Sequence, residues 1–337
     1  MKRLMRVIGK VLKWLGLGTL ALVVAFVIGA NLYAAYGRYK LNRDFPPPGR
    51  LVSVGSHRMH IHCVGMGEPT VVLDAGGGGF SVQWAGVMER AQTLSRICAF
   101  DRSGMGWSER SSDPPSAASR EADLEALLAV SGESAPFILV GHSVGGELAW
   151  LYAQNHPDQI VGLIAVDTVP PSMRDIEAIR EFNQIGEIRG WQRALILAIE
   201  RLGLVPFLLR GNDIEFEDFP PWANEVMKRS NFLSKGMISE QLSMYSLGLT
   251  ARDMDSLGDL PLTVIRHGIC GIMCESWGER SGDFERMWRE AQRGLSELSS
   301  NGRLLVAEES DHTIPTTQPD IVVDAIREMT EEYRAYR

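Results

Sequence analysis

The first 43 residues of the chain contain no acidic side chain, although they hold eight lysines and arginines. When these eight are set aside, the formal charge of −8 for the whole chain becomes −16 for the remainder. A body this acidic offers no basic surface to a phosphate backbone, which excludes nucleic acid as an expected partner. The chain also lacks internal repeats and low-complexity tracts, so we expect an ordinary folded domain after the basic amino terminus.

Cysteine is scarce, and its spacing matches no metal site. The four residues are Cys63, Cys98, Cys270 and Cys274. The last two have a Cys-x3-Cys spacing without a second ligand pair, and we interpret all four as small buried side chains. His57, His60 and His62 lie on one predicted strand, but only the last two share a face, and no carboxylate or cysteine at ligand spacing accompanies them. We therefore expect no metal site, and we expect these histidines to face solvent.

No charged residue occurs between Trp14 and Gly37. As a helix this stretch would measure roughly 36 Å, which exceeds the hydrocarbon core of about 30 Å. Five basic residues precede it, which favours a cytoplasmic amino terminus and an extracytoplasmic domain. A cleaved signal peptide would have a shorter apolar region and a small-residue cleavage site, so we predict an uncleaved anchor.

The predicted organisation therefore has four parts. A basic cytoplasmic segment covers residues 1–13, a single transmembrane helix covers 14–37, a linker covers 38–49, and a folded domain covers 50–337. The linker contains three consecutive prolines, which predict a stiff extended spacer between the membrane and the domain. The lipid bilayer is an expected partner through the amino-terminal helix.

Short apolar runs alternate with amphipathic segments in the domain. Two short strands are predicted at 50–54 and 57–64. Uninterrupted apolar runs, typical of strands buried on both faces of a parallel sheet, follow at 70–73, 97–100, 137–140, 160–166, 262–265 and 304–306. Helical patterns between them, such as 120–130 and 145–154, predict an α/β fold with right-handed crossovers. Residues 171–258 lack such runs and predict a helical cap insertion, which either packs on the core or forms a substrate-lining lid that could touch the bilayer.

A Gly-His-Ser-Val-Gly motif occupies residues 141–145, between the predicted strand PFILV and the predicted helix ELAWLYAQ. A serine hydroxyl is a poor nucleophile at neutral pH and needs a general base together with donors for the oxyanion. A tight turn from strand to helix is the context in which this motif presents a nucleophile. The sequence therefore predicts Ser143 as the nucleophile; the alternative is a serine that only caps the helix.

Four consecutive glycines, residues 76–79, follow the strand VVLD. Glycines let backbone N–H groups approach a developing negative charge, so Gly76 or Gly77, together with the N–H of Val144, are predicted to form an oxyanion hole. A phosphate-binding loop is the alternative, but no Gly-Lys-Ser/Thr follows the glycines.

Several segments together resemble the α/β-hydrolase superfamily, most of all its serine hydrolases with an amino-terminal anchor and the tag "RvCaYDRaGyGWS". The segments are AGGGGFSVQW, ICAFDRSGMGWSE, LVGHSVGGELA, GLIAVDTVPPSM and SDHTIPTTQPDIVVDAIREM. They follow one another over most of residues 50–334, apart from the insertion. The resemblance implies a mostly parallel eight-stranded sheet with helices on both faces and a helical cap.

The resemblance also implies a general base, His312, which lies after the last predicted strand and before the final helix. The acid that would orient this histidine is left open. Many family members carry an aspartate just beyond the seventh strand, where this chain has glycine, isoleucine and cysteine. Asp167, at the end of the strand after the nucleophile helix, is the first candidate; Glu275, with Asp283 behind it, is the second.

Two further expectations rest on the same resemblance. Asp101 and Arg102 are implied to shape their loop rather than to act in catalysis. In the family's sheet order the second and fourth strands are neighbours, which would place Cys63 and Cys98 on adjacent strands and allow a disulfide in an oxidising compartment.

The predicted reaction is hydrolysis of an ester-like bond in a small acyl substrate, through an acyl-enzyme and without a cofactor. Serine instead of aspartate in the motif argues against an epoxide hydrolase or a haloalkane dehalogenase. An amide, thioester or carbon–carbon bond hydrolase is the alternative within the class. A non-catalytic binding protein on the same scaffold, or a scaffold within a membrane complex, is the alternative from another class.

Overall fold

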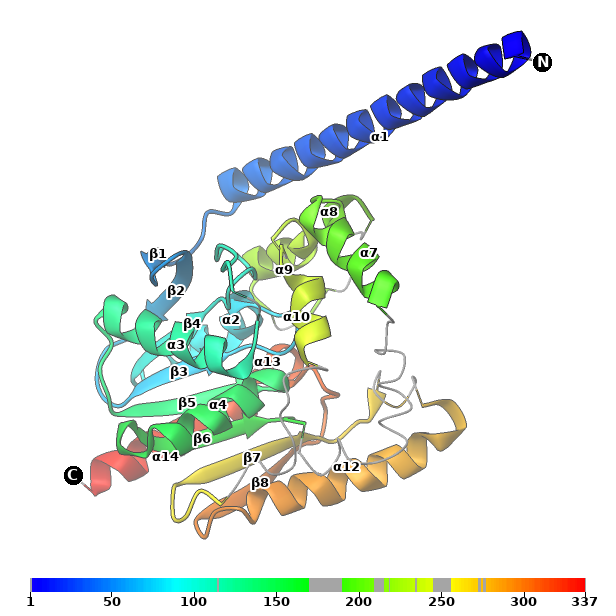
Figure 1. Cartoon of the computed structure of the whole chain (residues 1–337). Helices are drawn as coiled ribbons and strands as arrows, with labels where there is room; N and C mark the ends of the chain where they lie inside the picture. The colour runs from blue at the N-terminus through cyan, green and yellow to red at the C-terminus, as the bar shows by residue number, and fades with distance from the viewer. Residues whose placement is uncertain are drawn as a thin grey trace.

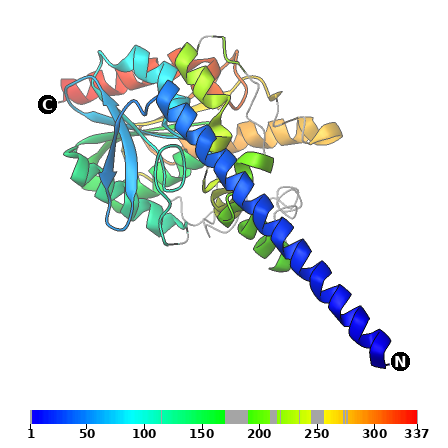
Figure 2. The ribbon, with the colours of Figure 1, turned by 90° about the horizontal axis from the view of Figure 1, so that it is seen from above.

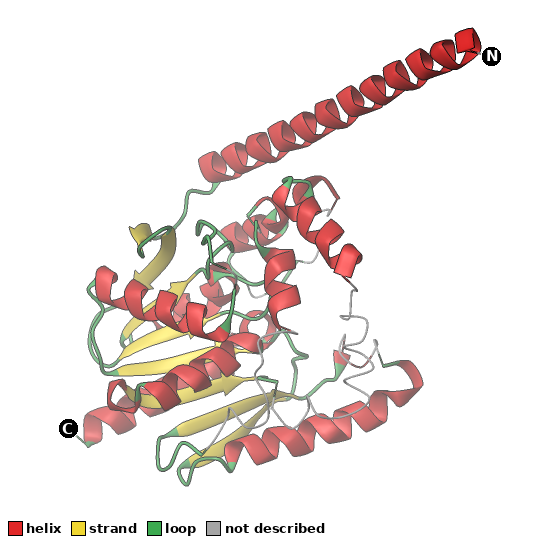
Figure 3. Ribbon diagram, in the orientation of Figure 1, coloured by secondary structure: helices red, strands yellow, loops and turns green. Residues whose placement is uncertain are grey.

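The computed structural model describes residues 2–113, 115–169, 190–208, 215–217, 219–233, 235–244, 256–271, 274 and 277–336. Its centre is one eight-stranded sheet in the order β1-β2-β4-β3-β5-β6-β7-β8 (Figures 1 and 3). The strands are β1 (Arg50–Ser53), β2 (Arg58–Val64), β3 (Thr70–Asp74), β4 (Arg96–Phe100), β5 (Phe137–His142), β6 (Ile160–Val166), β7 (Leu262–His267) and β8 (Gly302–Ala307). Only β2 runs antiparallel to its neighbours, so the predicted mostly parallel sheet is confirmed.

Helices cover both faces of the sheet, as the uninterrupted apolar strands require. On one face lie α3 (Ala117–Ser131), α4 (Val144–Asn155) and α12 (Ser281–Ser296), and on the other lie α2 (Ala85–Ala91) and α14 (Pro319–Ala335) (Figure 1). Successive strand residues alternate between the two cores: Val72 and Leu139 pack on the α3–α4 side, whereas Val71 and Ile138 pack on the α2–α14 side. Burial on both faces explains why these strands carry no polar alternation.

The described part of the insertion between β6 and β7 is helical, as predicted. It contains α7 (Gly190–Arg201), α8 (Val205–Leu208), α9 (Pro221–Met227) and α10 (Met237–Met244). The short 3-10 helix η3 (Ser230–Phe232) lies between the last two. These helices form a cap at the carboxyl edge of the sheet, above the ends of β5 and β6 (Figure 1).

Helix α1 (Lys2–Asp44) is a single helix, long and apolar enough to cross a membrane by length and composition. It differs from the predicted organisation at its end, because residues 38–44 of the predicted linker are helical. Nothing in that segment breaks a helix until the prolines at 46–48. The helix also contacts the domain: Leu41 is fully buried, and Asn42 accepts a 3.1 Å hydrogen bond from Trp107 Nε1. The prolines therefore do not hold the domain away from the anchor.

The expectation that the β2 histidines face solvent is wrong for two of them. His60 is fully buried, with Nδ1 3.0 Å from Asp101 Oδ2, and His57 is buried 3.5 Å from Asp123. The loop after β4 covers this part of the strand, since the His60 N–H donates to Ser108 Oγ. Asp101 also accepts the N–H groups of Ser81 and Trp107, so its carboxylate shapes this loop.

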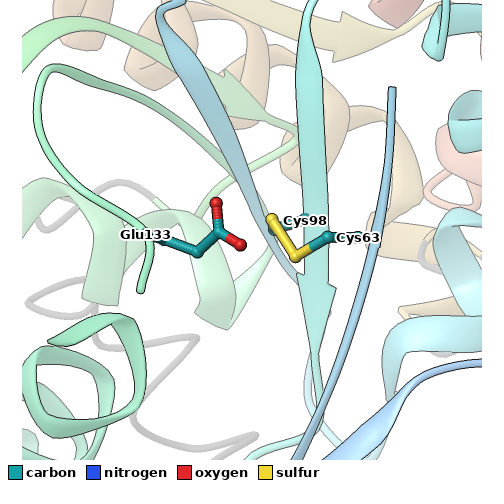
Figure 4. A group of neighbouring side chains, drawn as sticks. All are labelled: Cys63, Cys98 and Glu133. Carbon is teal, nitrogen blue, oxygen red and sulfur yellow. A yellow bond between two sulfur atoms is a disulfide. The ribbon is translucent and has the colours of Figure 1, made fainter. Parts of the chain in front are cut away.

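Cys63 and Cys98 form a disulfide between β2 and β4, with Cα atoms 4.0 Å apart (Figure 4). The disulfide implied by the family's sheet order is therefore present. Glu133 lies beside it, but its carboxylate pairs with Arg96, and the two sulfurs are bonded to each other and cannot act as thiolate ligands. Cys270 and Cys274 form a second disulfide, which the sequence interpretation missed.

We expect the double substitution Cys63→Ala/Cys98→Ala to lower the free energy of unfolding by about 2–4 kcal/mol, since this bond closes a 35-residue separation. Denaturant titration under oxidising conditions measures the loss. The control is Cys270→Ala/Cys274→Ala, which should lose less because it opens a separation of only four residues. Equal stability of the first variant and the unmodified protein would contradict the expectation.

Candidate functional site

Three neighbouring parallel strands end in polar side chains at the same edge of the sheet. Ser143 follows β5, Asp167 follows β6, and His267 is the last residue of β7. The next strand, β8, leads into the loop that carries His312. In open α/β sheets, the carboxyl ends of parallel strands are where ligands bind, so the fold gathers these residues at one site.

Ser143 stands on a strained turn between β5 and α4. Its φ of 51° and ψ of −120° are unusual for a residue with a side chain, and they persist only where the surroundings impose them. A Cβ on Gly145 would lie 2.5 Å from the carbonyl oxygens of Asp74 and Ala75, so only glycine lets α4 pass this close to β3. In α4, which is described throughout, the Ser143 side chain caps no backbone group, so the helix-capping interpretation does not account for it.

His312 and Asp167 are joined by a 2.6 Å hydrogen bond from Nδ1 to Oδ2. Asp167 is fully buried and His312 is partly exposed. Of the other two candidate acids, Glu275 lies outside the described residues, and Asp283 is exposed on α12, paired with Arg286. Among the described acids, Asp167 is therefore the one that holds the His312 ring.

The bond to Asp167 occupies Nδ1 of His312 and leaves Nε2 to face other partners. No hydrogen bond between the described side chains of His312 and Ser143 is formed in this structure. Catalytic hydrogen bonds are often long in ligand-free enzymes and tighten when substrate binds. The ring, the carboxylate and the serine thus share one edge of the sheet, and the hydrogen bond between His312 and Asp167 is already formed.

A second histidine, His267, binds the same carboxylate oxygen. Its Nδ1 lies 2.7 Å from Asp167 Oδ2, and its Nε2 lies 3.0 Å from Glu285 Oε2. Both ring nitrogens face carboxylates, so both donate and the ring is an imidazolium. Burial opposes this charge, but the hydrogen bonds to Asp167 and Glu285 outweigh burial and raise the pKa of His267.

Asp167 has four donors around its two oxygens. Oδ2 accepts from the two histidines, and Oδ1 accepts from Trp288 Nε1 at 2.9 Å and from the His267 N–H at 3.1 Å. Burial by itself would raise the pKa of Asp167, but the hydrogen bonds from His267 and His312 hold it well below its usual range. Asp167 is therefore a stable carboxylate in a buried position.

Sequence reasoning missed His267 and Trp288. One signal was available for His267, because it ends a predicted parallel strand at the edge that carries Ser143 and Asp167. No comparable signal marks Trp288, which reaches Asp167 from the interior of α12.

His142 links the nucleophile turn to the loops on either side of it. Its Nδ1 accepts a 2.9 Å hydrogen bond from Gln83 Nε2, and its Nε2 donates to the His312 carbonyl oxygen at 2.7 Å. These partners require a neutral ring with the proton on Nε2. Burial, and then the neighbouring His312, lower the pKa of His142 to about 3, so it stays neutral.

The glycine loop after β3 lies against the nucleophile turn. A Cβ on Gly76 would be 2.7 Å from His142 Nδ1 and 3.5 Å from Ser143 Cβ, which shows how closely the loop approaches. The Gly76 N–H donates to Gln83 Oε1, and the Gly78 N–H donates to Glu240 Oε2. The oxyanion role of Gly76 or Gly77 stays a prediction. The N–H of Gly76 is already engaged by Gln83, whereas Gly77 is exposed, which favours Gly77 of the two.

Arg102 fixes the glycine loop from behind. The buried guanidinium donates to the carbonyl oxygens of Ala75 (2.5 Å) and Gly76 (2.6 Å), to Asp74, and to Glu240 of α10 (2.6 Å). The resemblance implied a structural role for this arginine, and its contacts are of that kind. Because Glu240 belongs to the cap, the same cluster joins the cap to the loop beside Ser143.

We expect the free energy of unfolding lost in His267→Gln to be largest below about pH 6.5 and to shrink as the pH rises through the raised pKa of His267. The imidazolium stabilises the folded state by its hydrogen bonds to Asp167 and Glu285, and this contribution disappears when the ring loses its proton. Urea titration at a series of pH values measures the difference from the unmodified protein. Glu285→Gln, which removes one of the two carboxylates that raise this pKa, should show a smaller loss with the same pH dependence, whereas a loss for His267→Gln that is the same at every pH would contradict the expectation.

A family model described as "alpha/beta hydrolase fold" matches residues 69–197. Among curated proteins, the Hormonema carpetanum protein named "Probable transporter efuK" is 27% identical over 323 residues. That alignment covers 85% of this chain and 43% of the relative, so the chain spans less than half of that protein's length.

Solved structures show the same fold. The epoxide hydrolase CorEH superposes with a TM-score of 0.60 at 20% identity, over 85% of this chain and 99% of that chain. A thermophilic esterase from Thermogutta terrifontis gives a TM-score of 0.59 at 20% identity, over 84% and 98%. At such identities the likeness concerns the fold, and the chemistry has to be argued from the site.

Proposed function

We propose that this chain, which has the α/β-hydrolase fold, is a membrane-anchored serine hydrolase that cleaves an ester-like bond through an acyl-enzyme on Ser143. The observation that carries the proposal is the hydrogen bond between His312 and the buried Asp167, at the sheet edge where Ser143 stands on a strained turn. A serine, a histidine and an orienting carboxylate are the groups that acyl transfer requires.

In the proposed reaction, His312 Nε2 takes the proton from Ser143 Oγ as the oxygen attacks the substrate carbonyl carbon. The N–H groups of Gly77 and Val144 donate to the oxyanion of the tetrahedral intermediate. Val144 begins α4, where backbone N–H groups have no partner inside the helix. His312 then gives its proton to the departing alcohol, and the acyl group remains on Ser143.

Water completes the cycle. His312 removes a proton from a water molecule, which attacks the acyl carbon, and the proton passes to Ser143 as the acid is released. Asp167 holds Nδ1 of His312 protonated throughout, so Nε2 is the nitrogen that accepts and returns the proton. The residues of the chain supply every step, without a cofactor.

The nucleophile supports this reaction over the one named for the similar epoxide hydrolase. An alkyl-enzyme intermediate from an epoxide needs a carboxylate nucleophile, whereas this chain has a serine at that position. The esterase-like reaction fits a serine directly. Amide, thioester and carbon–carbon bonds are the competing substrates for the same residues.

Two observations support an extracytoplasmic domain. Both disulfides fit an oxidising compartment, and the basic residues concentrate before the apolar stretch of α1. The proposed orientation places the amino terminus in the cytoplasm and the domain on the other side of the membrane.

The test uses the full chain in lipid nanodiscs and a fluorophosphonate probe, which labels an activated serine. We expect labelling that Ser143→Ala abolishes and that Ser131→Ala, which alters a serine at the end of α3, leaves unchanged. A folded chain that takes up no label would overturn the proposal. Nitrophenyl esters of increasing acyl length, compared with matched anilides and thioesters, would then identify the preferred bond.

A further inference from the structure

Helix α7 carries an apolar stripe on the face that points away from the domain. Trp191, Leu195 and Ala198 follow the spacing i, i+4 and i+7 along one side of the helix, and Leu202, directly after its end, continues the spacing at i+11. The Trp191, Leu195 and Leu202 side chains are 72%, 54% and 46% exposed. Such a face on a helix that also carries polar residues needs a partner of apolar chemistry.

The orientation of this stripe is fixed by a buried acid on the opposite side of α7. Glu200 lies about half a turn around the helix from the stripe, as expected at 3.6 residues per turn. Its carboxylate is buried, pairs with Arg110 at 2.7 Å, and accepts the N–H groups of Ile238 and Ser239 at the start of α10. Turning the stripe inward would expose this charge cluster, so the apolar side faces outward.

At its carboxyl-terminal end the stripe adjoins the residues through which the cap contacts α1. Asn31 donates to the Leu202 carbonyl oxygen at 2.7 Å, and the Phe207 ring of α8 lies 5.3 Å from the Phe26 ring. Phe207 and its neighbour Leu208 are about half exposed. Viewed from above, α1 passes over the cap helices (Figure 2). The exposed apolar face of the cap is therefore continuous with the apolar surface of α1.

The place on α1 where Phe207 contacts Phe26 determines how deep the cap would lie in the bilayer. A helix that enters the hydrocarbon at Trp14 crosses about 30 Å in about 20 residues, so it leaves near Tyr33. Phe26 is seven residues before that exit, roughly 10 Å inside the boundary for an upright helix and less for a tilted one. Apolar faces of interfacial helices sink about 5–10 Å into a leaflet, so a cap held at Phe26 reaches the depth at which such faces lie.

We propose that the α7–α8 face, defined by Trp191, Leu195, Leu202, Phe207 and Leu208, is embedded in the lipid leaflet beside α1. The embedding rests on the proposed membrane span of α1, whereas the substrate class that follows from it rests also on the proposed catalytic reaction. Lipid acyl chains then cover the stripe, and the opposite side of α7, which carries Glu200, stays on the domain. The cap over the active site then opens toward the bilayer, and the substrates that fit are acyl esters dissolved in it.

The experiment places one environment-sensitive fluorophore at a time on the full chain in nanodiscs. Since the four native cysteines are paired in disulfides, an added cysteine is the single free thiol. The test sites are Leu195→Cys and Leu208→Cys. Leu22→Cys, 74% exposed on α1, reports the span, and Val130→Cys, 55% exposed at the end of α3, reports the side of the domain away from the cap. Quenching by lipids with a spin label on the acyl chain is measured at each site.

We expect the two cap sites to be quenched, and their emission shifted to shorter wavelength, in the same way as the Leu22 site and unlike the Val130 site. Cap sites that behave like Val130, while Leu22 is quenched, would overturn the embedded cap and leave the span intact. Absence of quenching at Leu22 would show that α1 does not span the bilayer, and it would overturn the inference as well. The fluorophosphonate labelling of Ser143 is read separately in the same samples, so failure of the catalytic proposal is distinguishable.

Discussion

Replacing Asp167 with asparagine is expected to lower kcat about 10⁴-fold while the fold persists, because an amide can hold His312 in the wrong tautomer. In the native site the carboxylate accepts a hydrogen bond from the Nδ1–H group and leaves Nε2 as the base. The asparagine NH₂ group would donate to Nδ1 and place the ring proton on Nε2, where it blocks proton transfer from Ser143. Steady-state ester hydrolysis measures the loss.

The same substitution also tests the choice of acid. Asp283→Asn changes an exposed aspartate of α12 that pairs only with Arg286 among the ion pairs of the described chain, and it should keep nearly full activity. If Asp283→Asn were the damaging variant and Asp167→Asn the mild one, the assignment of the acid would be reversed. Circular dichroism of both variants shows whether a fall in activity reflects a loss of fold.

Replacing Arg102 with methionine is expected to cost about 3–5 kcal/mol of unfolding free energy, because it removes the guanidinium that pairs with two buried carboxylates. Asp74 and Glu240 both pair with this guanidinium and are almost fully buried. Burial opposes the charge on Arg102, but the two carboxylates outweigh it and raise its pKa, so the guanidinium stays charged; burial raises the pKa of Asp74 in turn. Chemical denaturation measures the loss.

Arg58→Met is the matched control for that experiment. Arg58 pairs with Glu109 at 2.6 Å, but both side chains are substantially exposed, and such pairs contribute roughly 0–1 kcal/mol. We further expect Arg102→Met to lower activity beyond its effect on stability, since the Ala75 and Gly76 carbonyl groups lose their donor beside Ser143. Similar losses for Arg102→Met and Arg58→Met would show that the buried cluster contributes little.

Much of the fold was predictable because parallel strands buried on both faces leave a simple pattern. The run at 160–166 matches β6 without error, and the other runs differ from their strands by one or two residues at one or both ends. The strained turn at Ser143 was predictable for a similar reason, because the strand, the glycines of the turn and the helix follow one another in the sequence. These features depend on neighbours along the chain, and the sequence records such neighbours directly.

The errors concern contacts between distant segments. His60 alternates with apolar residues as a solvent-facing residue would, but Asp101, which binds it, comes from the loop after β4. Gly76 and Gly77 could not be distinguished until Gln83 was found to occupy one of their N–H groups. The acid could not be chosen for the same reason, since the choice depends on which carboxylate reaches His312 across 145 residues of sequence.

His267 illustrates a different limit. Its position at a strand end was visible, but its role depends on Glu285, which comes from α12, and on sharing one oxygen of Asp167 with His312. A shared acceptor depends on three side chains together, here His267, His312 and Asp167, and no spacing between two residues in the sequence indicates it.

The packing of α1 on the cap has a consequence for how this protein would respond to its surroundings. Leu41 is fully buried, and a Cβ on Gly37 would overlap the Phe232 ring, so α1 is a structural member of the domain and its removal would expose the surface that it covers. A change in bilayer thickness tilts a spanning helix. Because α1 packs against α8 and η3, a tilt of the proposed membrane span would move the cap helices with it, so the lipid composition would affect the conformation of the cap.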